Sequence, residues 1–310
     1  MSSDEKVPAP PHPDLDAARR RVTVVGAAAR DLVVQAALPG AGASAPVTRV
    51  IERLGGKGAN IAAGVLQLIP GAAVSLIAVL GADAAGDAAA TDATDLGLDI
   101  AAVARRGETS LLVDVTDGRG ERRLLEHVPA AAIVTASDVR AAASVLRAAG
   151  VVVLQLQQDA EALVEAADIA HDAGAVLVLD GATGGAARDR LLPRATVVRA
   201  DAAEAEMLTG RTVSSRADAE RAAADLLERG PRLVALAVPG EGDLVVWPEG
   251  SHLFAHRESA IVDPTGAGDA FIAGLVAGLL ADEDPFSVGQ RGADAAATAV
   301  QQLGGFTRFG

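Results

Sequence analysis

Short hydrophobic runs alternate with longer amphipathic stretches along most of the chain. Five runs rich in Val and Leu have the length of buried strands: 21–26, 151–158, 175–181, 195–201 and 232–240. Alanine-rich stretches of helical length lie between the later runs, at 137–149, 160–173 and 216–229, and each is followed by a glycine. This rhythm predicts an α/β fold: a doubly wound, mostly parallel sheet with helices on both faces.

Two further segments alternate hydrophobic and polar residues, as strands with one exposed face do. The first reads TRVIER over 48–53, and the second, 109–127, contains two strand-like runs around the turn residues Asp117-Gly118-Arg119-Gly120. We expect a small β lid with strands from about 33–53 and 109–127. The expected organisation is a flexible, proline-rich extension over 1–20 and one large domain over 21–310.

Composition and charge exclude several classes of protein. The 310 residues include no Cys, which excludes a disulfide scaffold and a thiolate nucleophile. The net charge is −14 and basic clusters are short, so we expect no nucleic-acid partner. Residues 1–20 lack the apolar core of a signal peptide, and the longest apolar run, 270–281, is shorter than the roughly 20 residues of a membrane span. We therefore expect a cytoplasmic protein with small-molecule partners and no membrane contact.

A glycine-rich motif near the C-terminus, DPTGAGDAF, indicates phosphoryl transfer. Gly266, Ala267 and Gly268 directly precede Asp269 where a helix is expected to begin. Amides at a helix start lack intrahelical partners and carry partial positive charge, and small side chains let an anion approach them. A carboxylate beside this anion hole can accept a proton from an incoming hydroxyl. An N-cap Asp after a glycine turn is the common structural alternative.

A second motif, GGKGAN, precedes another expected helix. Gly55 and Gly56 would let a polyhydroxy ligand lie against the backbone, and Asn60 can both donate to and accept from vicinal hydroxyls. A flexible loop before an ordinary helix would produce the same pattern. The chain has no GxxxxGK[ST] string, and the segment after the first strand is not GxGxxG, so neither a Walker A loop nor a dinucleotide fingerprint is indicated.

Together, these motifs resemble the signatures of the ribokinase-like (PfkB) carbohydrate kinases. GGKGAN, DPTGAGDAF, the early Asp of ARDLVV, the segment ADAAEAEMLTG and the turn AVPGEG occur in the family's order, and the resemblance covers nearly all of the chain after residue 20. It implies a ribokinase-like fold with a small lid and an ATP-dependent sugar kinase, with ribose as the first expected acceptor and ribose 5-phosphate as product. It also implies Mg²⁺, in many members K⁺, and a homodimer through the lid as one outcome.

The resemblance further implies a role for each matched residue. Asp269 would be the catalytic base, and the amides of Gly266, Ala267 and Gly268 would form the anion hole. The implied sugar-binding residues are Asp31, Gly55, Gly56, Lys57, Asn60 and Gln157. The implied nucleotide-binding residues are Asp201, Glu204, Gly240, Gly242 and Thr265. Glu204 would hold Mg²⁺ through water, and Asp263 would lie near the monovalent cation.

Four departures from the family pattern leave the acceptor open. Ala29 stands where the family usually has Asn, Gln157 where it has a sugar-binding Glu, Asp201 where it has Asn, and Pro239 where it has the first Gly of the nucleotide turn. The alternatives to ribose are fructose, a nucleoside, pseudouridine or a 2-keto-3-deoxy sugar. An alternative of another class is a catalytically weak homologue that binds sugar or nucleotide in a regulatory role.

Overall fold

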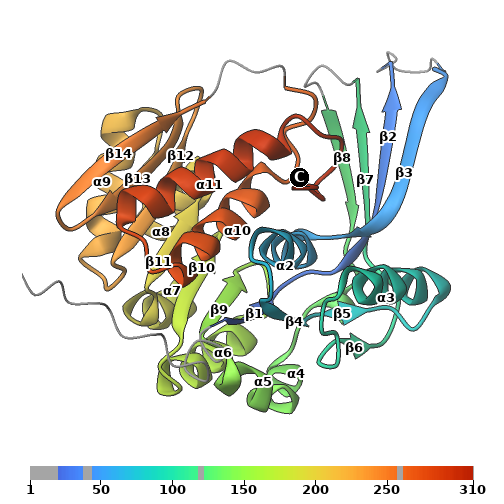
Figure 1. Ribbon diagram of the computed structural model, residues 1–310, viewed down its shortest axis with the longest axis horizontal. Coiled ribbons are helices and arrows are strands. Elements are labelled where there is room, and N and C mark those ends of the chain that lie inside the picture. Colours follow the sequence, from blue (N-terminus) through green and yellow to red (C-terminus); the bar gives the residue numbers. More distant parts are fainter. Residues whose placement is uncertain (1–19, 38–43, 118–121, 257–260, 310) are drawn as a thin grey trace, which may run out of the picture.

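The central element of the computed structural model is an eight-stranded sheet (Figure 1). The model describes residues 20–37, 44–117, 122–256 and 261–309. Within them the strand order is β14-β13-β12-β11-β10-β9-β1-β4, parallel from β12 to β4 and antiparallel at the β13–β14 edge. The strands are β1 (Arg21–Val25), β4 (Ala73–Ile77), β9 (Val151–Gln155), β10 (Val176–Asp180), β11 (Val197–Ala200), β12 (Leu233–Val238), β13 (Gly242–Trp247) and β14 (Gly250–Ala255). The predicted α/β fold with a mostly parallel sheet is confirmed.

Helices cover both faces of this sheet. One face carries α2 (Lys57–Leu68), α3 (Ala84–Leu96), α10 (Ala267–Leu280) and α11 (Pro285–Ala299). The other carries α4 (Ala136–Ala141), α5 (Ala143–Ala148), α6 (Ala160–Asp172), α7 (Gly185–Leu191), α8 (Ala202–Thr209) and α9 (Arg216–Leu227). Adjacent strand residues such as Val152 and Val153 belong to opposite core layers, because successive side chains of a strand point to opposite faces. This is why the strands are hydrophobic throughout instead of alternating.

The helix that follows the GAGD motif is buried along most of its length. In α10 the residues from Asp269 to Gly278 are all buried between α2, α11 and the sheet. A side chain at Gly274 would overlap the backbone of Arg291, so glycine there lets α11 pack closely. The hydrophobicity of α10 therefore reflects packing inside the domain. None of the helices in the described ranges has the length and hydropathy of a membrane span.

The lid is a separate four-stranded mixed sheet (Figure 1, right). Its order is β3-β2-β7-β8, formed by β2 (Ala29–Ala36), β3 (Val47–Gly55), β7 (Leu111–Thr116) and β8 (Arg122–His127). The β2–β7 pair is parallel and the two outer pairs are antiparallel. The predicted lid is confirmed, although β2 begins before residue 33. Residues 118–121 of the expected hairpin turn, and 1–19 of the expected extension, lie outside the described residues.

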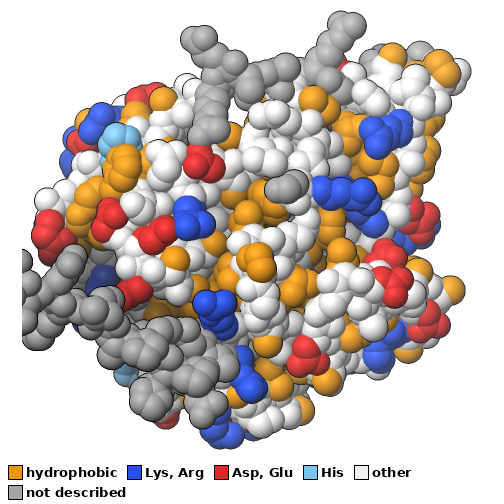
Figure 2. Space-filling view, in the orientation of Figure 1, with side chains coloured by type: hydrophobic (Ala, Val, Ile, Leu, Met, Phe, Trp, Pro, Cys, Tyr) orange, Lys and Arg blue, Asp and Glu red, His pale blue; other side chains and the backbone are white. Residues whose placement is uncertain are grey.

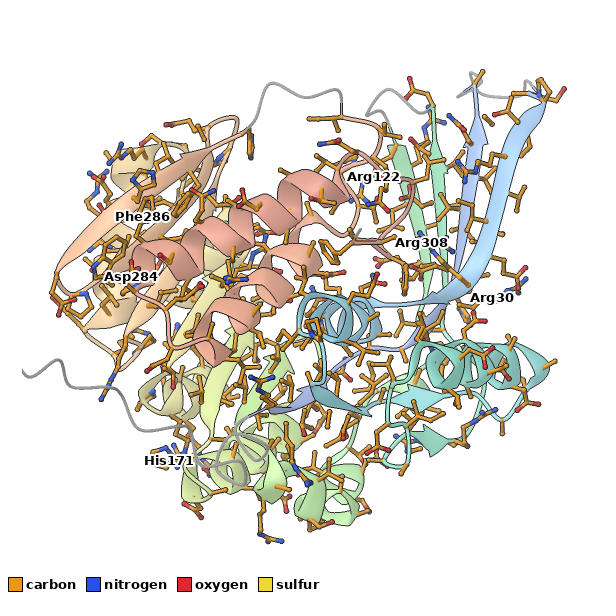
Figure 3. All side chains as sticks on the ribbon, viewed as in Figure 1. Arg30, Arg122, His171, Asp284, Phe286 and Arg308 are labelled. Atoms are coloured by element: carbon orange, nitrogen blue, oxygen red, sulfur yellow. The ribbon has the colours of Figure 1, made fainter. Side chains whose placement is uncertain are left out.

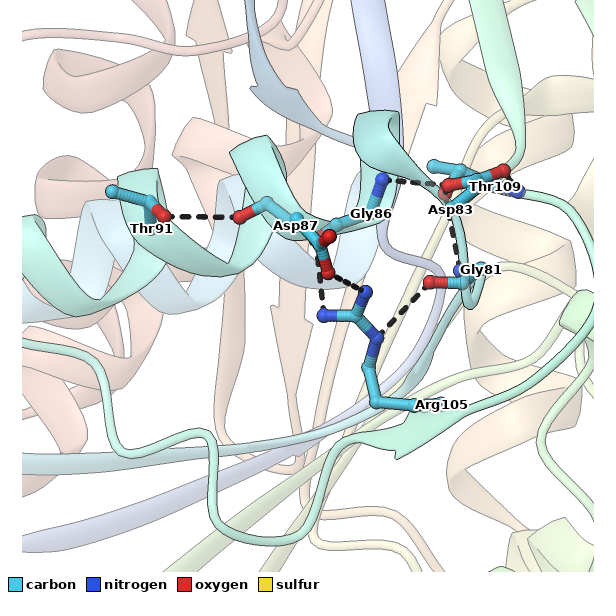
Figure 4. A network of polar contacts seen from close by, with 7 residues as sticks. All are labelled: Gly81, Asp83, Gly86, Asp87, Thr91, Arg105 and Thr109. Atoms are coloured by element: carbon cyan, nitrogen blue, oxygen red, sulfur yellow. Dashed lines mark hydrogen bonds and ion pairs between the residues drawn. The ribbon is translucent and has the colours of Figure 1, made fainter.

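A polar network ties the base of the lid to the main domain (Figure 4). Asp83 caps α3 by accepting from the amide of Gly86, and it also accepts from the amide and hydroxyl of Thr109, just before β7. Arg105, in the short pair formed by β5 (Val79–Leu80) and β6 (Ala104–Arg105), donates to Asp87 and to the carbonyl of Gly81. The start of β7 is thus held to α3 at a defined position.

The structure differs from the sequence expectations mainly in the details of single elements. The expected helix over 137–149 is two short helices, α4 and α5, separated at Ala142. Strands β4, β13 and β14 were not expected from the pattern, and β13 and β14 add the antiparallel edge. Over the face shown in Figure 2, Lys and Arg side chains are interspersed with Asp and Glu.

Candidate active site

The two glycine motifs meet in one cavity beneath the lid. Its volume is about 250 Å³. Among the residues expected from the sequence, the cavity is lined by Asp31, Lys57, Asn60, Asp201, Thr265, Gly266, Ala267, Gly268 and Asp269. The lining also includes Val33, Leu112, Asp114, Arg122, Leu124, Glu126, Arg199, Pro264 and Gly305, which the sequence reasoning had not singled out. The fold therefore brings residues more than 200 positions apart to one place.

The GAGD turn begins α10 with a conformation that needs glycine. Gly266 is the N-cap with φ of 78°, and a side chain there would overlap the backbone of Gly305. Ala267 and Gly268 form the first helical positions, so their amides belong to the end of the helix that attracts anions. Gly266, Ala267 and Gly268 line the cavity, and their expected role as an anion hole stays a prediction.

Asp269 is placed to act as a base. It lies in the first turn of α10 and is 7% exposed. Its Oδ2 accepts a hydrogen bond of 3.0 Å from the side-chain Nδ2 of Asn60. Burial, helped by the charge of Asp180, raises the pKa of Asp269 to about 6, against the opposing effects of Asn60, Lys57 and Arg199. A carboxylate with this pKa is still ionised at pH 7 but holds a proton better than a free Asp.

Asp31 lies beside it, on lid strand β2. It is buried, and burial raises its pKa to about 7, partly offset by the charge of Arg53. Its Oδ1 and the Oδ1 of Asn60 are buried and have no hydrogen-bond partner among the described residues. Buried acceptors without partners are costly, so a ligand whose hydroxyl groups donate to them fits this part of the cavity.

Gly55 and Gly56 do not line the cavity. A side chain at Gly55 would overlap the carboxyl group of Asp31, so this glycine makes room for the acid. Gly56 is the N-cap of α2 with φ of 84°, and a Cβ there would lie 2.9 Å from the carbonyl oxygen of Ala27. Both glycines thus have a structural reason in the neighbouring protein, and direct contact with a sugar stays a prediction.

Two cations stand among buried acids on the other side of the cavity. The Nζ of Lys57 lies 3.5 Å from Glu204, and Arg199 lies 3.5 Å from Asp180 and 4.0 Å from Glu204. Burial lowers the pKa of Lys57, but the charges of Asp180, Glu204 and Asp269 outweigh it, so the net shift is upward and Lys57 stays charged. Arg199 and Asp180 were missed. The available signal was charge within the hydrophobic runs 195–201 and 175–181.

Asp201 and Glu204 form the start of α8. The carboxylate of Asp201 accepts from the amide of Glu204, and that of Glu204 accepts from the amide of Asp201, both at 2.8 Å. This reciprocal capping explains why Asp can occupy a position where the family has Asn. Both residues stay near the cationic pair, and Asp201 reaches the cavity.

The residues around Glu204 are compatible with a hydrated magnesium ion. Asp180 and Glu204 are buried carboxylates, and Oδ1 of Asp180 has no hydrogen-bond partner in the described part of the chain. Mg²⁺ commonly keeps several waters and binds through one or two carboxylates plus substrate phosphates. The absence of a cluster of three or more acidic or His ligands among the described residues is consistent with that mode of binding.

Besides Gly55, Gly56 and Glu204, four more expected site residues do not line the cavity. Gln157 is exposed, and its side-chain oxygen accepts from Gln155 at 3.0 Å. Gly240 and Gly242 belong to the β12–β13 hairpin, where a side chain at Gly242 would overlap the carbonyl of Phe254. Asp263 is fully buried and accepts from the amides of Thr265 at 2.9 Å and Gly304 at 2.8 Å. Their expected ligand-binding roles stay predictions.

The lid contributes side chains to the cavity that no sequence motif indicates. Val33, Leu112 and Leu124 contribute apolar side chains, and Arg122 reaches from β8 to the hydroxyl of Thr265 in the turn before α10 (Figure 3). The same hydroxyl contacts Asp114 on β7. Burial raises the pKa of Asp114, with Thr265 acting in the opposite direction. Arg122, Asp114 and Thr265 therefore connect the lid directly to the anion hole.

The start of α10, the start of α2 and the lid strands meet in one cavity on an α/β fold, as the resemblance to carbohydrate kinases predicts. The chain belongs to the pfkB family of carbohydrate kinases, whose model matches residues 19–307. It is thus a carbohydrate kinase that acts on sugar hydroxyls.

Individual relatives agree with this class. The chain is 28% identical to the ribokinase of Mus musculus over 261 residues, which is 82% of this chain and 80% of that protein. The structure of Arabidopsis thaliana ribokinase complexed with ribose and ATP has a TM-score of 0.73 at 24% identity, covering 91% of this chain and 93% of that one. Phosphofructokinase-2 from Escherichia coli, solved in complex with potassium, has a TM-score of 0.77 at 19% identity, covering 92% and 94%. At these identities the structures share the fold with this chain.

Proposed function

We propose that this protein is an ATP-dependent ribokinase that forms ribose 5-phosphate. The observation that carries the proposal is the set of Asp31, Asn60 and Asp269 in one cavity: two buried oxygen acceptors without partners beside a base with a raised pKa. The name of the mouse relative and the ribose and ATP in the Arabidopsis complex support ribose as the acceptor.

In the proposed reaction the acceptor hydroxyl attacks the γ-phosphorus of ATP. A bond forms between the hydroxyl oxygen and phosphorus, and the bond from phosphorus to the β,γ-bridging oxygen breaks, with its electron pair leaving on ADP. Asp269 takes the hydroxyl proton and later releases it to solvent. The amides of Gly266 to Gly268 and the ammonium of Lys57 offset the charge of the phosphoryl group. Magnesium, held near Glu204 through its water shell, would neutralise further phosphate charge.

The test is a panel assay of ADP release. The acceptors are ribose, fructose, a nucleoside, pseudouridine, a 2-keto-3-deoxy sugar and fructose 6-phosphate, each with ATP and Mg²⁺. The last acceptor is included because Arg122 lines the cavity, and a guanidinium there suits a phosphorylated sugar. Ribose should show the highest kcat/KM. Preference for another acceptor would overturn the ribose assignment, and no transfer to any acceptor would favour the regulatory alternative.

We also propose that any monovalent cation binds beside Asp263 without depending on its carboxylate. Both oxygens of Asp263 already accept protein donors, from Thr265 and from Gly304. Backbone carbonyls of the adjoining turn would then be the ligands. Activity in KCl should exceed activity in NaCl at equal ionic strength. Equal rates in the two salts would remove potassium from the proposal.

Finally, we propose that the lid pairs two subunits. Lid residues expose large hydrophobic side chains, with Val50 at 58% and Leu125 at 61% exposure. An exposed lid strand with such residues is a suitable surface for a second copy of the chain. Light scattering of the wild type should give a dimer and Leu125→Asp a monomer. A monomeric wild type would contradict this arrangement.

A further inference from the structure

Arg199 lines the cavity, and the proposed mechanism does not yet give it a role. It lies on β11, within a strand that is otherwise hydrophobic, and its side chain is 12% exposed. A Cβ built on Gly268 would meet the guanidinium at 2.7 to 2.8 Å through three of its atoms. The guanidinium therefore lies directly against the backbone of the anion hole, and glycine at position 268 is what makes room for it.

The hydrogen-bonding capacity of this guanidinium is poorly used by the protein. Its contacts to Asp180 and Glu204, at 3.5 and 4.0 Å, are longer than the 2.7–3.2 Å or so of an ordinary N–H···O bond. Its Nε is buried and has no hydrogen-bond partner among the described residues. Arg presents five donors in a rigid fork that suits phosphate oxygens. The unused donors thus point to an anionic ligand.

The charges around Arg199 keep it ionised in spite of burial. Burial lowers its pKa, but Asp180, Asp243, Glu204 and Asp269 raise it by more, so the net shift is upward. The same acids would repel a triphosphate, and Asp201 adds a negative charge at a position where the family has a neutral Asn. A positive charge fixed at the anion hole offsets this repulsion where the moving phosphoryl group must pass.

We propose that Arg199 is a further catalytic residue, whose guanidinium donates to the oxygens of the transferring γ-phosphoryl group. The proposal rests on the proposed kinase function. The bonds made and broken are those of that reaction: oxygen of the acceptor to phosphorus, and phosphorus to the leaving oxygen of ADP. Arg199 adds hydrogen bonds to the oxygens that stay on phosphorus, where charge is spread in the transition state. Arginines acting in this way accelerate phosphoryl transfer by about 10³–10⁵-fold.

A purely structural role gives a different expectation. Asp180 is fully buried, and Arg199 is one of the two cations that offset it. If Arg199 served only as its counter-ion, removing the guanidinium would do harm because it leaves a buried charge unpaired. Replacing Asp180 by Asn at the same time would then bring activity back to the level of Asp180→Asn alone.

The experiment compares Arg199→Met, Arg199→Lys, Asp180→Asn and the double variant Arg199→Met/Asp180→Asn. Arg216→Met, which removes an exposed arginine paired with Glu220, is the matched control and should behave as wild type. Arg199→Met should lose about 10²–10³-fold in kcat, with the sugar KM changed by less than about threefold. Arg199→Lys should recover part of the loss, because it keeps the charge. The double variant should recover none of it.

Binding measurements separate this proposal from the proposed function. By calorimetry, Arg199→Met should weaken ATP binding at least about tenfold more than ADP binding, because only ATP carries the γ-phosphoryl group. If the wild type phosphorylates no acceptor, the proposed function fails, and this ATP-to-ADP difference alone decides the role of Arg199. Equal losses for ATP and ADP, kcat within about threefold of wild type, or restored activity in the double variant would each overturn it.

Discussion

The two halves of the cavity are built in different ways. The half that we propose for the phosphoryl group, the phosphoryl half, comes from the main domain: the start of α10, the start of α2 and the end of β11. Charged groups of this half lie close together, as Lys57 and Glu204 do at 3.5 Å, and Asp269 is buried among them. The half that we propose for the acceptor, the acceptor half, combines Asn60 of α2 with the lid, whose outer strand β8 is exposed along its whole length. The side chains that the main domain contributes to the cavity thus face side chains that the lid contributes.

This difference shows which parts of a site can be found from residues that are neighbours in the sequence. At a helix start, the amides, the small residues and the base are neighbours in sequence, as Gly266 to Asp269 are. The lid instead contributes alternate residues of β2, β7 and β8, such as Leu112 and Asp114 from β7 and Leu124 and Glu126 from β8. These residues share a face because side chains alternate along a strand. Such a face is a product of strand pairing and has no contiguous motif.

The largest effect is expected at the base of the phosphoryl half. Asp269→Asn keeps the shape of the side chain and removes the proton acceptor. We expect kcat to fall by roughly 10²–10⁴-fold with nucleotide affinity little changed. Steady-state rates and ADP binding measure the two quantities. Activity within a few-fold of the wild type would show that Asp269 is not the base.

The same variant carries its own test of folding. Because the pKa of Asp269 is raised to about 6 in the folded state, its ionised form destabilises the fold above that pH, and the cost vanishes below about pH 4. Asp269→Asn should therefore have a higher melting temperature than the wild type at pH 8, from a gain of at most about 3 kcal/mol in the free energy of unfolding. This gain should shrink at pH 4. A lower melting temperature at pH 8 would mean that lost activity reflects damaged structure.

The next effect tests the boundary between the halves. Gly55→Ala puts a methyl group where the Asp31 carboxyl group lies, so it should displace that acid while leaving the anion hole intact. We expect the sugar KM to rise by about tenfold or more, with the KM for ATP within about twofold. Ala63→Gly, in the middle of α2, is the control for a general loss of stability. Equal changes in both KM values would indicate that Asp31 does not belong to the acceptor half alone.

The pH dependence should report Asp269 together with Asp31, whose pKa is raised to about 7 and lies in the same range. A base must be ionised to act, so kcat/KM should fall as the pH drops below the pKa of about 6 for Asp269, by roughly tenfold at pH 5. Since the charge of Asp180 raises that pKa, Asp180→Asn should move the acidic limb to lower pH. A limb that stays in place in Asp180→Asn would assign it to another group.

A smaller effect is expected where the lid meets the anion hole. Arg122→Leu removes the contact from β8 to Thr265 and leaves the main domain unchanged. The closed lid should then be less favoured, because β8 loses its hydrogen bond to the turn before α10 while the Asp114 contact of β7 to Thr265 remains. We expect a few-fold rise in the sugar KM and more ATP hydrolysis without sugar, since lid closure excludes water. Unchanged hydrolysis in the absence of sugar would separate Arg122 from closure.

The same difference between neighbouring residues and residues brought together by folding explains which features the sequence predicts. The sheet, the helices and the position of Asp269 in the cavity could be predicted because buried runs, helix starts and GAGD are local patterns. Arg199 could not, because its role depends on Gly268 lying against it from another part of the chain. For Gly55 the position was predicted as part of the site, but not the reason, since its neighbour Asp31 is reached only by pairing of β2 with β3.

The smallest effect is expected at Gln157, where sequence and structure differ most about the acceptor half. A Glu at this position in the family suggests a sugar contact, yet Gln157 is exposed, lies outside the cavity and accepts from Gln155. The side-chain oxygen of Gln155 in turn accepts a hydrogen bond of 3.2 Å from the backbone amide of Ala27, close to the GGKGAN loop. A carboxylate at 157 would stay hydrated and could still accept from Gln155, so Gln157→Glu should change kcat/KM on ribose by less than about threefold. Gln155→Leu is the sharper companion, because it removes the buried contact to Ala27 and should cost more than Gln157→Glu. A gain of tenfold or more on ribose with Gln157→Glu would mean that the segment after β9 closes onto the sugar, and that the acceptor half includes this segment as well as Asn60 and the lid.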